Sequence, residues 1–366
     1  MKKFIKKEPV LSVAALAALV SCFFVRPGKE YLGYIDISVI ILLFSLMLVV
    51  AGLIKANLFG VISSGILKAS DNCRTVSLLL VNITFITAMF ITNDVALITL
   101  VPLTAGLMAK NNKKQLIPAV VMETVAANLG SMMTPFGNPQ NLYLYKHFNM
   151  DPGHFLKVVV PYGIISLVLI NVFTFFMIKK ENITSVTIEK AEIEDKKLLI
   201  IYLAAFVICV LCVLRVINTW ICLAVVLAAC FVTGYRLLFK VDYFLLLTFC
   251  AFFIFVGNLG NIGPVRDTMM DLVGGREFIC AAAASQVISN VPAAVMLSGF
   301  TENADALVAG TDIGGLGTLV ASLASLISYK QYSASEGADM KKYMAVFSVI
   351  NVVFLAFLCG SYFILN

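Results

Sequence analysis

Two acidic residues, Asp94 and Asp312, stand inside long apolar stretches of the sequence, each beside a run of small polar residues. A carboxylate can ligate a cation or carry a proton, and placing an ionisable group at the centre of a membrane costs roughly 2.5–3.5 kcal/mol on insertion scales. We therefore predict that Asp94 and Asp312 serve cation or proton coupling. The alternative is a structural acid that is neutralised or hydrogen-bonded. Glu123 is a third such acid, and its position leaves open a place nearer the cytoplasmic end.

Short polar motifs interrupt two apolar stretches, residues 75–109 and 276–300. The first motif reads Thr-Asn-Asp and the second reads Ser-Asn-Val-Pro. Hydroxyl and amide groups can donate hydrogen bonds to an anion and offer oxygens to a cation. An Asn at such a turn would also cap the helix that follows, which is the structural alternative. The substrate-binding residues predicted from these motifs are Thr92, Asn93, Ser289 and Asn290.

Glycine, proline and amide residues break two further apolar stretches. Residues 128–141 read Asn-Leu-Gly-Ser-Met-Met-Thr-Pro-Phe-Gly-Asn-Pro-Gln-Asn, and residues 310–318 read Gly-Thr-Asp-Ile-Gly-Gly-Leu-Gly-Thr. Neither segment can continue a regular lipid-facing helix, because the freed backbone groups would lack partners in hydrocarbon. Half-helix ends that line a cavity offer N–H groups to an anion and C=O groups to a cation. The sequence thus predicts substrate contacts at Asn138 and Thr318, and ion contacts at Gly130, Gly137 and Gly314.

The composition of the whole chain places these residues in a membrane. Of 366 residues, 60% are hydrophobic and 13% are charged, whereas a soluble domain carries about a quarter charged residues. The mean hydropathy is +0.96. The net charge of +6 falls in short clusters between apolar runs, which is typical of contacts with lipid headgroups and argues against a nucleic-acid partner. The nine cysteines lie within apolar stretches, which favours packing over a metal or redox site.

Nine apolar runs are long enough to span a hydrocarbon core about 30 Å thick. They lie near residues 9–25, 34–54, 115–145, 155–178, 198–216, 217–235, 241–258, 303–329 and 342–364. The run from Glu277 to Ile288 is different, because it gives only about 18 Å of helix at 1.5 Å per residue and cannot cross. We therefore predict that residues 75–109 and 276–300 form re-entrant helical hairpins.

The distribution of basic residues orients the chain. If both hairpins return to the side they leave, 20 of the 27 Lys and Arg residues fall on the same side as the N-terminus. Loops rich in Lys and Arg stay in the cytoplasm. We predict a multi-pass protein of the inner (plasma) membrane with a cytoplasmic N-terminus. A lipoprotein signal that ends at Cys22 is the alternative for the first apolar run.

An internal repeat relates the two halves of the chain. At an offset of 184 residues, Gly130 aligns with Gly314, Thr134 with Thr318, Asn138 with Ser322 and Asn141 with Ser325. An odd helix between the halves makes the second half enter from the opposite side, as in inverted-repeat transporters. We predict an all-α polytopic membrane protein with two re-entrant hairpins and two discontinuous helices.

The repeat also defines the predicted organisation. Residues 1–178 form the first repeat, residues 179–216 a linker and the odd helix, and residues 217–366 the second repeat. Each repeat contains two spans, a hairpin, a broken span and a closing span. The hairpins are residues 75–109 and 276–300, and the broken spans are residues 115–145 and 303–329.

Together these motifs resemble the ion transporter superfamily, which includes divalent-anion/sodium symporters, citrate-transporter-like permeases and arsenite permeases. The resemblance spans nearly the whole chain and is closest to the compact bacterial anion-permease branch. It implies a homodimer and an elevator-type movement of a transport domain against a scaffold. In the dicarboxylate symporters each hairpin tip carries Ser-Asn-Thr, binds sodium and helps to hold a carboxylate. Asp94 and Val291 stand where those tips have Thr, and arsenite permeases show a similar Asn-Asp tip.

The sequence therefore predicts a secondary-active transporter of a small anionic solute, carboxylate-like or an oxyanion, coupled to a cation or a proton. An arsenite efflux permease and a cation/proton antiporter are alternatives with the same fold. A membrane-embedded enzyme is a remote alternative, because His147 and His154 have no Ser or Cys nucleophile in their segment. No cofactor is expected beyond Na⁺ or H⁺ as the coupling ion. The expected partners are the solute, the lipid bilayer and a second copy of the chain.

Overall fold

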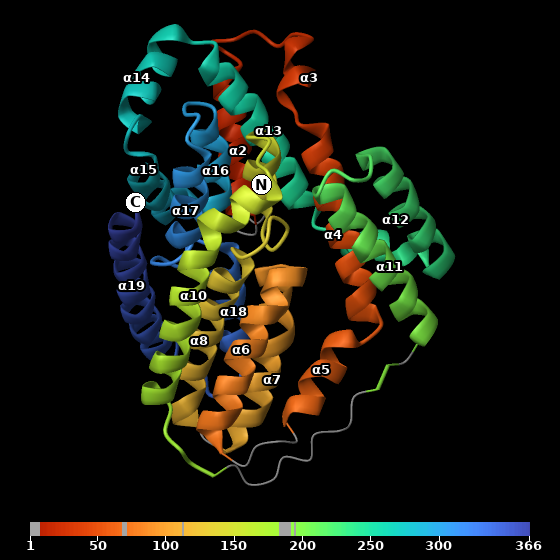
Figure 1. Cartoon of the computed structure of the whole chain (residues 1–366), viewed down its shortest axis with the longest axis vertical. Helices are drawn as coiled ribbons and strands as arrows, with labels where there is room; N and C mark the ends of the chain where they lie inside the picture. Colours follow the sequence, from red (N-terminus) through yellow and green to blue (C-terminus); the bar gives the residue numbers. More distant parts are fainter. Residues whose placement is uncertain (1–7, 68–71, 112, 183–191, 194) are drawn as a thin grey trace.

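The chain folds as a bundle of helices. The computed structural model describes residues 8–67, 72–111, 113–182, 192–193 and 195–366 (Figure 1). Over those ranges every regular element is a helix, apart from an isolated bridge between Asn72 and Asn182. The prediction of an all-α fold is confirmed.

The helices of the first half are α2 (Pro9–Ser21), α3 (Glu30–Tyr34), α4 (Ile37–Lys55), α5 (Leu58–Leu67), α6 (Cys73–Ile91), α7 (Asn93–Asn111), α8 (Lys113–Ser131), α9 (Pro139–His147) and α10 (Pro152–Met177). Those of the second half are α11 (Lys196–Val213), α12 (Thr219–Thr233), the short 3₁₀ helix η1 (Tyr235–Lys240), α13 (Tyr243–Gly260), α14 (Gly263–Val273), α15 (Glu277–Ile288), α16 (Asn290–Ser298), α17 (Ala304–Gly314), α18 (Leu323–Ser333) and α19 (Met340–Leu365).

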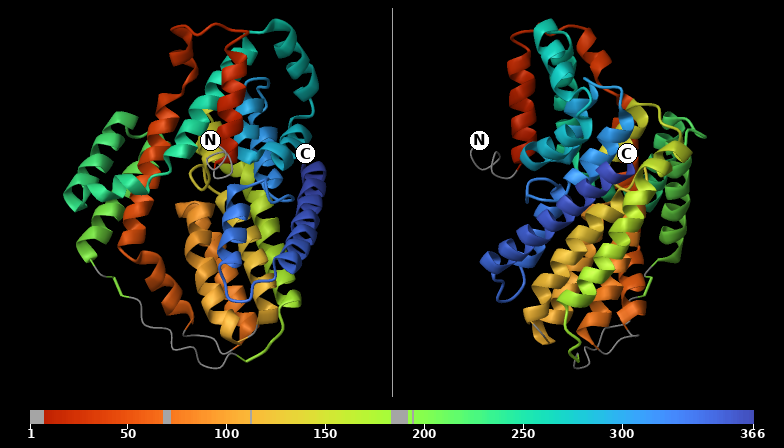
Figure 2. Two further views of the ribbon diagram at one scale, coloured as in Figure 1. Left: turned by 180° about the vertical axis from the view of Figure 1, so that it is seen from behind. Right: turned by 60° about the vertical axis from the view of Figure 1, so that its left-hand side comes forward.

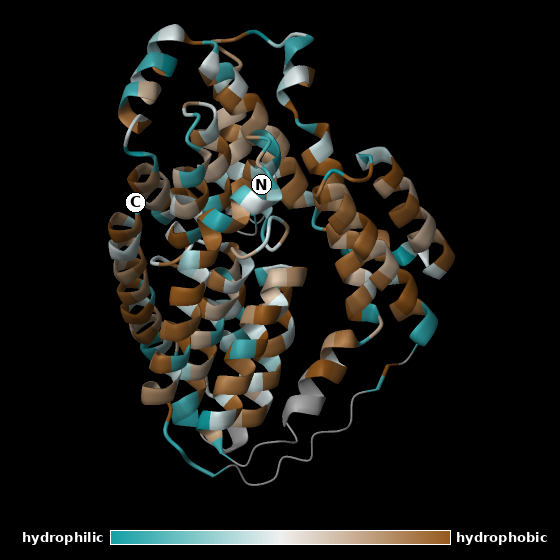
Figure 3. Ribbon diagram, viewed as in Figure 1, coloured by the Kyte–Doolittle hydropathy of each residue, from teal (hydrophilic) through white to brown (hydrophobic). Residues whose placement is uncertain are grey.

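Aspartate side chains start the long helices by accepting hydrogen bonds from the first-turn backbone N–H groups, which have no partner within the helix. The capping residues of α4, α10, α11, α13 and α19 are Asp36, Asp151, Asp195, Asp242 and Asp339. Between their caps these helices are apolar on most of their surface (Figure 3), which suits contact with lipid on one side and with other helices on the other.

Among the described residues, six helices are long and apolar enough to cross a membrane, namely α4, α6, α10, α11, α13 and α19. The chain is therefore a multi-pass membrane protein. Helix α6 was expected to be one arm of a re-entrant hairpin, yet it and its partner α7 are each 19 residues long. The arms of the second hairpin, α15 and α16, have 12 and 9 residues. Re-entrance therefore remains a prediction, with length supporting it for the second hairpin alone.

The helices form two groups that meet along one side of the molecule (Figure 2). In the first group, the framework helices, α4 packs against α11 and α12, and α2 packs against α13. The second group, the hairpin helices, comprises α6–α10 and α15–α19. Helices α9 and α16 lie at the boundary, because α9 contacts α4 and α16 contacts α13.

Within the second group, two helical hairpins and two broken helices point inward. The α6–α7 hairpin rises from the lower end of the molecule and the α15–α16 hairpin comes from the upper half, so that their turns face the middle (Figure 1). Helix α8 breaks after Ser131 and resumes as α9, and α17 breaks after Gly314 and resumes as α18. Helix α6 packs on α8, and α15 packs on α17, so each hairpin is paired with the broken helix of its own half.

Candidate functional site

Both hairpin turns hold a residue in a backbone conformation that side chains rarely adopt. Thr92 has φ 114° and ψ 147°, and Ser289 has φ 75° and ψ 153°. Residues other than glycine hold such angles at a cost of about 1–3 kcal/mol and cluster at functional sites. The two turns therefore share one strained geometry, although their sequences differ.

The Asn that follows each strained residue is buried at the start of the second hairpin arm. Asn93 and Asn290 are both 4% exposed. The amide of Asn93 donates to Oδ1 of Asn128 on α8 at 3.3 Å, and the backbone N–H of Asn290 donates to the carbonyl of Ala321 in the second break at 2.9 Å. Each hairpin tip thus contacts a broken helix.

Glycines allow each broken helix to approach the first arm of its hairpin. A Cβ atom on Gly130 would lie 2.2 Å from the carbonyl oxygen of Phe85 on α6, and one on Gly314 would lie 2.8 Å from Cα of Ala282 on α15. The two glycines are aligned by the repeat, and their partners occupy equivalent positions in the two hairpins. Gly137 has a different role, because its Cβ would strike the carbonyl of Ser131 within the first break.

Two threonines hydrogen-bond the broken segments to the hairpins in the same way. The hydroxyl of Thr134 donates to the carbonyl of Met89 at 2.5 Å, and that of Thr318 donates to the carbonyl of Gln286 at 2.9 Å. Each acceptor lies three residues before the strained residue of its turn. Thr318 is exposed, and its hydroxyl is already hydrogen-bonded to the carbonyl of Gln286. From the sequence we expected this hydroxyl to contact substrate.

At the centre, each repeat donates a hydrogen bond to the other. The amide of Asn138, which caps α9, donates to Oδ1 of Asp312 on α17 at 2.9 Å. The hydroxyl of Ser322, which caps α18, donates to Oδ1 of Asn128 on α8 at 2.8 Å. Because Asn138 is the equivalent of Ser322, and Asn128 of Asp312, the two contacts are related by the repeat. We call this set of four residues the reciprocal crossing.

The two sides of the reciprocal crossing differ in charge. Asp312 supplies a carboxylate where the first repeat has the amide of Asn128. Oδ1 of Asp312 also accepts from Gln140 at 3.4 Å, but its Oδ2 is buried without a hydrogen-bond partner among the described residues, as is Oδ1 of the neighbouring Asn141. The second side therefore presents two buried oxygens without a hydrogen-bond partner among the described residues, one of them from a carboxyl group.

Asp94 lies in the first turn of α7, next to Asn93, which contacts Asn128 of the crossing. Its Oδ1 is buried and unpartnered within the part of the chain that the structure describes, while the residue as a whole is partly exposed. The next residue, Val95, packs against the hydrophobic cluster built mainly by the framework helices. Asp94 therefore stands near the boundary between the two groups of helices.

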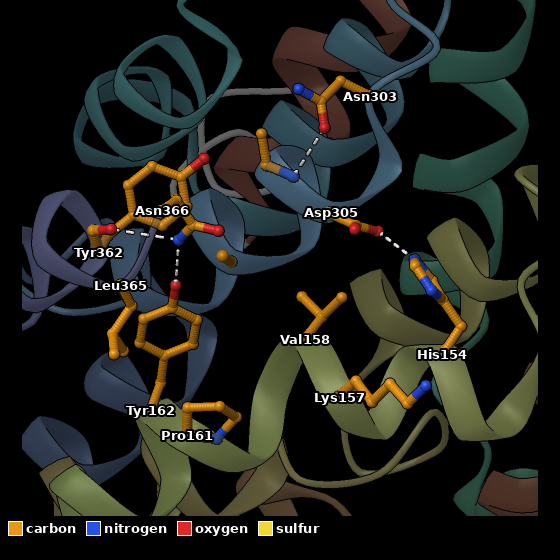
Figure 4. Close-up of a pocket in the computed structure, with 12 residues that line it drawn as sticks. His154, Lys157, Val158, Pro161, Tyr162, Asn303, Asp305, Tyr362, Leu365 and Asn366 are labelled. Carbon is orange, nitrogen blue, oxygen red and sulfur yellow. Dashed lines mark hydrogen bonds and ion pairs between the residues drawn. The ribbon is translucent and has the colours of Figure 1, made fainter.

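A cavity of about 510 Å³ lies elsewhere, between the beginnings of α10 and α17 and the end of α19 (Figure 4). His154 and Asp305 form an ion pair across it at 2.7 Å, and Asn366 donates to the hydroxyl of Tyr162 at 2.8 Å. None of the predicted binding residues lines this cavity. The geometry therefore favours the reciprocal crossing as the candidate site.

The sequence motifs did not predict four residues of the site, namely Asn128, Gln140, Asn141 and Ser322, although the repeat aligns Asn141 with Ser325 and Asn138 with Ser322. Asn128 could have been found in the same way, because the offset of 184 places it on Asp312. No motif or repeat alignment marked Gln286 as a site residue. Its amide donates to the carbonyls of Gly314 and Leu316 and so holds the second break against α15.

Comparison with known families fits this architecture. The family model described as "Citrate transporter" matches residues 4–310. The chain belongs to this family. The citrate transporter family therefore accounts for both hairpins, the first broken helix and most of α17. The chain is a membrane transporter and not an enzyme, as the sequence predicted.

The relatives agree with membership of the citrate transporter family. An uncharacterised transporter of Methanocaldococcus jannaschii is 34% identical over 303 residues, covering 82% of each chain. An inner membrane protein of Escherichia coli is 29% identical over 320 residues, again covering 82% of each chain. A putative transporter of Dictyostelium discoideum named arsB is 27% identical over 168 residues, which are 45% of this chain and 29% of that protein.

Proposed function

We propose that this protein is a secondary-active transporter that carries a small anionic solute together with a cation, with both bound around the reciprocal crossing. The observation that carries the proposal is the meeting of two broken helices and two hairpin tips through reciprocal polar contacts, Asn138 with Asp312 and Ser322 with Asn128. Transporters built from inverted repeats bind substrate and coupling ions where discontinuous helices meet.

The cation is assigned to the charged side of the crossing. Oδ2 of Asp312 and Oδ1 of Asn141 are buried oxygens without partners among the described residues. A buried carboxylate oxygen left unpaired is costly unless a proton or a cation satisfies it. Carbonyl groups freed at the ends of α8 and α17 would complete an oxygen shell.

The anion is assigned to the helix N-termini that converge on the crossing. Helices α7, α16, α9 and α18 begin at Asn93, Asn290, Pro139 and Leu323, next to residues of the crossing. The N-terminus of a helix carries a partial positive charge and free N–H groups, which favour an anion. No Lys, Arg or His side chain belongs to the described crossing or to its hydrogen-bonding neighbours, so the helix N-termini and the bound cation together must offset the negative charge of Asp312 and of the solute.

The same lack of cationic side chains favours one second candidate, a neutral hydroxylated solute such as arsenous acid. Such a solute could donate hydrogen bonds to Asp312 and accept them from Asn93 without adding negative charge. The similarity to the protein named arsB is consistent with this candidate. An arsenite efflux permease would then replace the anion carrier, on the same fold.

The wider proposal follows the expectations from sequence. The protein would work as a homodimer in the inner membrane, with a cytoplasmic N-terminus and with the hairpin helices moving as a transport domain against the framework helices. The boundary between the two groups is built mainly of apolar and aromatic contacts, such as Phe136 with Phe206 and Tyr143 with Phe253. Such a boundary can slide without breaking buried ion pairs.

Uptake into proteoliposomes tests the proposal. Purified protein would be offered labelled succinate, citrate and arsenite, each with a sodium gradient, a pH gradient or neither. We expect gradient-driven accumulation of a carboxylate, lost in Asn93→Ala and Asn290→Ala while folded protein is retained, since loss of an Asn cap costs about 1 kcal/mol. Accumulation of arsenite alone would select the second candidate, and no gradient-driven accumulation of any solute would contradict both.

A further inference from the structure

A second buried acid lies inside the hairpin helices, away from the reciprocal crossing. Glu123 of α8 has no exposed surface. Its Oε1 accepts a hydrogen bond from the hydroxyl of Thr104 on α7 at 2.5 Å, while its Oε2 is buried and finds no hydrogen-bond partner in the described part of the chain. The surrounding side chains belong to an apolar cluster that includes Val120 and Met108.

The fold does not require an acid at this position. The repeat offset of 184 places Glu123 on Leu307, which is also completely buried. A leucine therefore fills the equivalent place in α17, and the carboxyl group adds a desolvation cost to the first repeat without a matching structural gain. Such a residue is better explained by chemistry than by packing.

A row of buried polar side chains lies between the neighbourhood of Glu123 and the crossing, in groups that share hydrogen bonds. The amide of Asn128 donates to the hydroxyl of Ser325 at 3.4 Å. One turn further along α18, the hydroxyl of Ser328 lies 2.5 Å from that of Thr124, the neighbour of Glu123 on α8, and 3.1 Å from that of Tyr343 on α19. All these side chains are buried.

The same row continues to the surface. The ring of Tyr343 stacks on that of Tyr332 with 4.7 Å between centroids, and the hydroxyl of Tyr332 accepts the backbone N–H of the exposed Asp339 at 3.0 Å. Polar groups thus lie at intervals between the crossing, the neighbourhood of Glu123 and the N-terminus of α19, without a continuous chain of hydrogen bonds between the described residues. The neutral tyrosines and serines of this row can each accept one proton and donate another.

We propose that Glu123 is a proton-binding site of the transport cycle, distinct from the cation site at Asp312. The proton adds to Oε2, and the Thr104 hydroxyl continues to donate to Oε1, so that no other bond has to break. A proton fits better than a metal cation, because the hydroxyl of Thr104 is the one described polar group that bonds to this carboxyl and a cation would need a shell of several oxygens.

Few other titratable groups face this carboxyl. On the helices that pack against α8, Tyr343 of α19 belongs to the row, Asp312 of α17 lies in the crossing, and Arg74 of α6 donates to the carbonyl of Ile178. Asp94 stands in the first turn of α7, and His154 of α10 pairs with Asp305 of α17 at the surface. Lys330 of α18 and Lys341 of α19 are exposed. Protonation of Glu123 therefore changes the charge of a region without a described counter-charge.

Infrared spectroscopy of the purified protein tests this site without any transport. A protonated carboxyl group has a carbonyl stretching band that an ionised carboxylate lacks. We expect the difference spectrum between wild type and Glu123→Gln to show this band at low pH and to lose it as the pH is raised. In Thr104→Val, the band should disappear at a different pH from that in wild type. A difference spectrum that shows no such band at any pH, or a band that no pH change removes, would overturn the proposal.

Transport measurements give a second test of Glu123, and this test rests on the proposed function. One pH unit corresponds to about a tenfold accumulation for each coupled proton, and we expect Glu123→Gln to lose this factor while it keeps any sodium-driven uptake. Glu277→Gln is the matched control, because Glu277 is also buried and also accepts from a threonine, Thr301. Equal loss in both variants would overturn the assignment to Glu123, whereas failure of all uptake in wild type would count against the proposed function and leave the infrared result standing.

Discussion

The charge of the reciprocal crossing rests on one side chain, that of Asp312. Its Oδ1 holds Asn138 and Gln140, while its Oδ2 is free of described partners. An amide in this place would keep an acceptor for Asn138 and remove the charge. Asn128 shows that the equivalent position in the first repeat tolerates such an amide. The proposed role of Asp312 as a cation ligand can therefore be separated from its role in packing.

We predict that Asp312→Asn folds and loses stabilisation by sodium. A ligand at 100 times its Kd raises the free energy of unfolding by about 2.7 kcal/mol, so wild type should show a clear thermal shift that the variant lacks. Asp305→Asn, in the first turn of the same helix, is the control and should keep the shift. An unchanged sodium shift in Asp312→Asn would remove this residue from the cation site.

Backbone strain at the first hairpin turn leads to a second prediction at this scale. Thr92 holds φ 114°, a conformation that glycine adopts without the cost of about 1–3 kcal/mol paid by other residues. Part of this gain is offset by about 0.5–1 kcal/mol for the greater freedom of glycine in the unfolded chain. We expect Thr92→Gly to unfold at a slightly higher temperature than wild type, and Thr92→Val to gain nothing. A lower unfolding temperature for the glycine variant would show that the Thr side chain stabilises the turn.

At the scale of the elements, the sequence predicted which residues are equivalent more successfully than which residues touch. The offset of 184 pairs Thr134 with Thr318, and the structure shows that both donate to the carbonyl three residues before their hairpin turn. The contact of Asn138 with Asp312 could not be derived from that offset. Alignment identifies residues in equivalent places, whereas contacts between the repeats depend on how two inverted units pack in space.

The lengths of the hairpin helices were a separate prediction from the sequence. The twelve residues of α15 agree with the short arm expected from Glu277 to Ile288. The first hairpin was expected over residues 75–109, and α6 and α7 run from Cys73 to Asn111 with 19 residues each. Pro102 was part of the argument for a re-entrant second arm, and it lies inside α7, where neighbouring helices can compensate for the lost backbone hydrogen bond.

Close packing of α8 on α6 gives a prediction about these elements. A methyl group on Gly130 would lie 2.2 Å from the carbonyl oxygen of Phe85, and backbone atoms cannot move aside as a flexible side chain can. We expect Gly130→Ala to lower the unfolding temperature and transport, since overpacking costs about 1–3 kcal/mol. Gly106→Ala on α7 is the control, because nothing lies within 4 Å of its added carbon, and it should be neutral or stabilising by up to about 1 kcal/mol. A stable, active Gly130→Ala would mean that α8 and α6 can separate.

For the whole molecule, transport by an elevator requires the hairpin helices to move as a unit against the framework helices. The contacts between the two groups include ring pairs, among them Phe136 of the first break with Phe206 of α11 at 5.9 Å between centroids. Within the hairpin helices an apolar cluster is joined by polar, reciprocal contacts, as in the paired amides of Asn82 and Asn171 at 2.7 and 3.0 Å. The first kind of contact can slide, and the second kind holds a rigid body together.

This difference gives the last prediction, on cross-linking. Cysteines placed at Phe136 and Phe206, joined by a bifunctional thiol reagent, would tie a moving segment to a fixed one, and we expect uptake into proteoliposomes to stop and to return when the link is cleaved. Cysteines at Asn82 and Asn171 would link α6 to α10 within one group and should leave uptake unchanged by the reagent. The protein already has nine cysteines, so both pairs belong in a cysteine-free background that still transports. If the linked Phe136–Phe206 pair transports at the unlinked rate, the two groups do not move past each other, because a covalent tie across a sliding boundary must block the sliding.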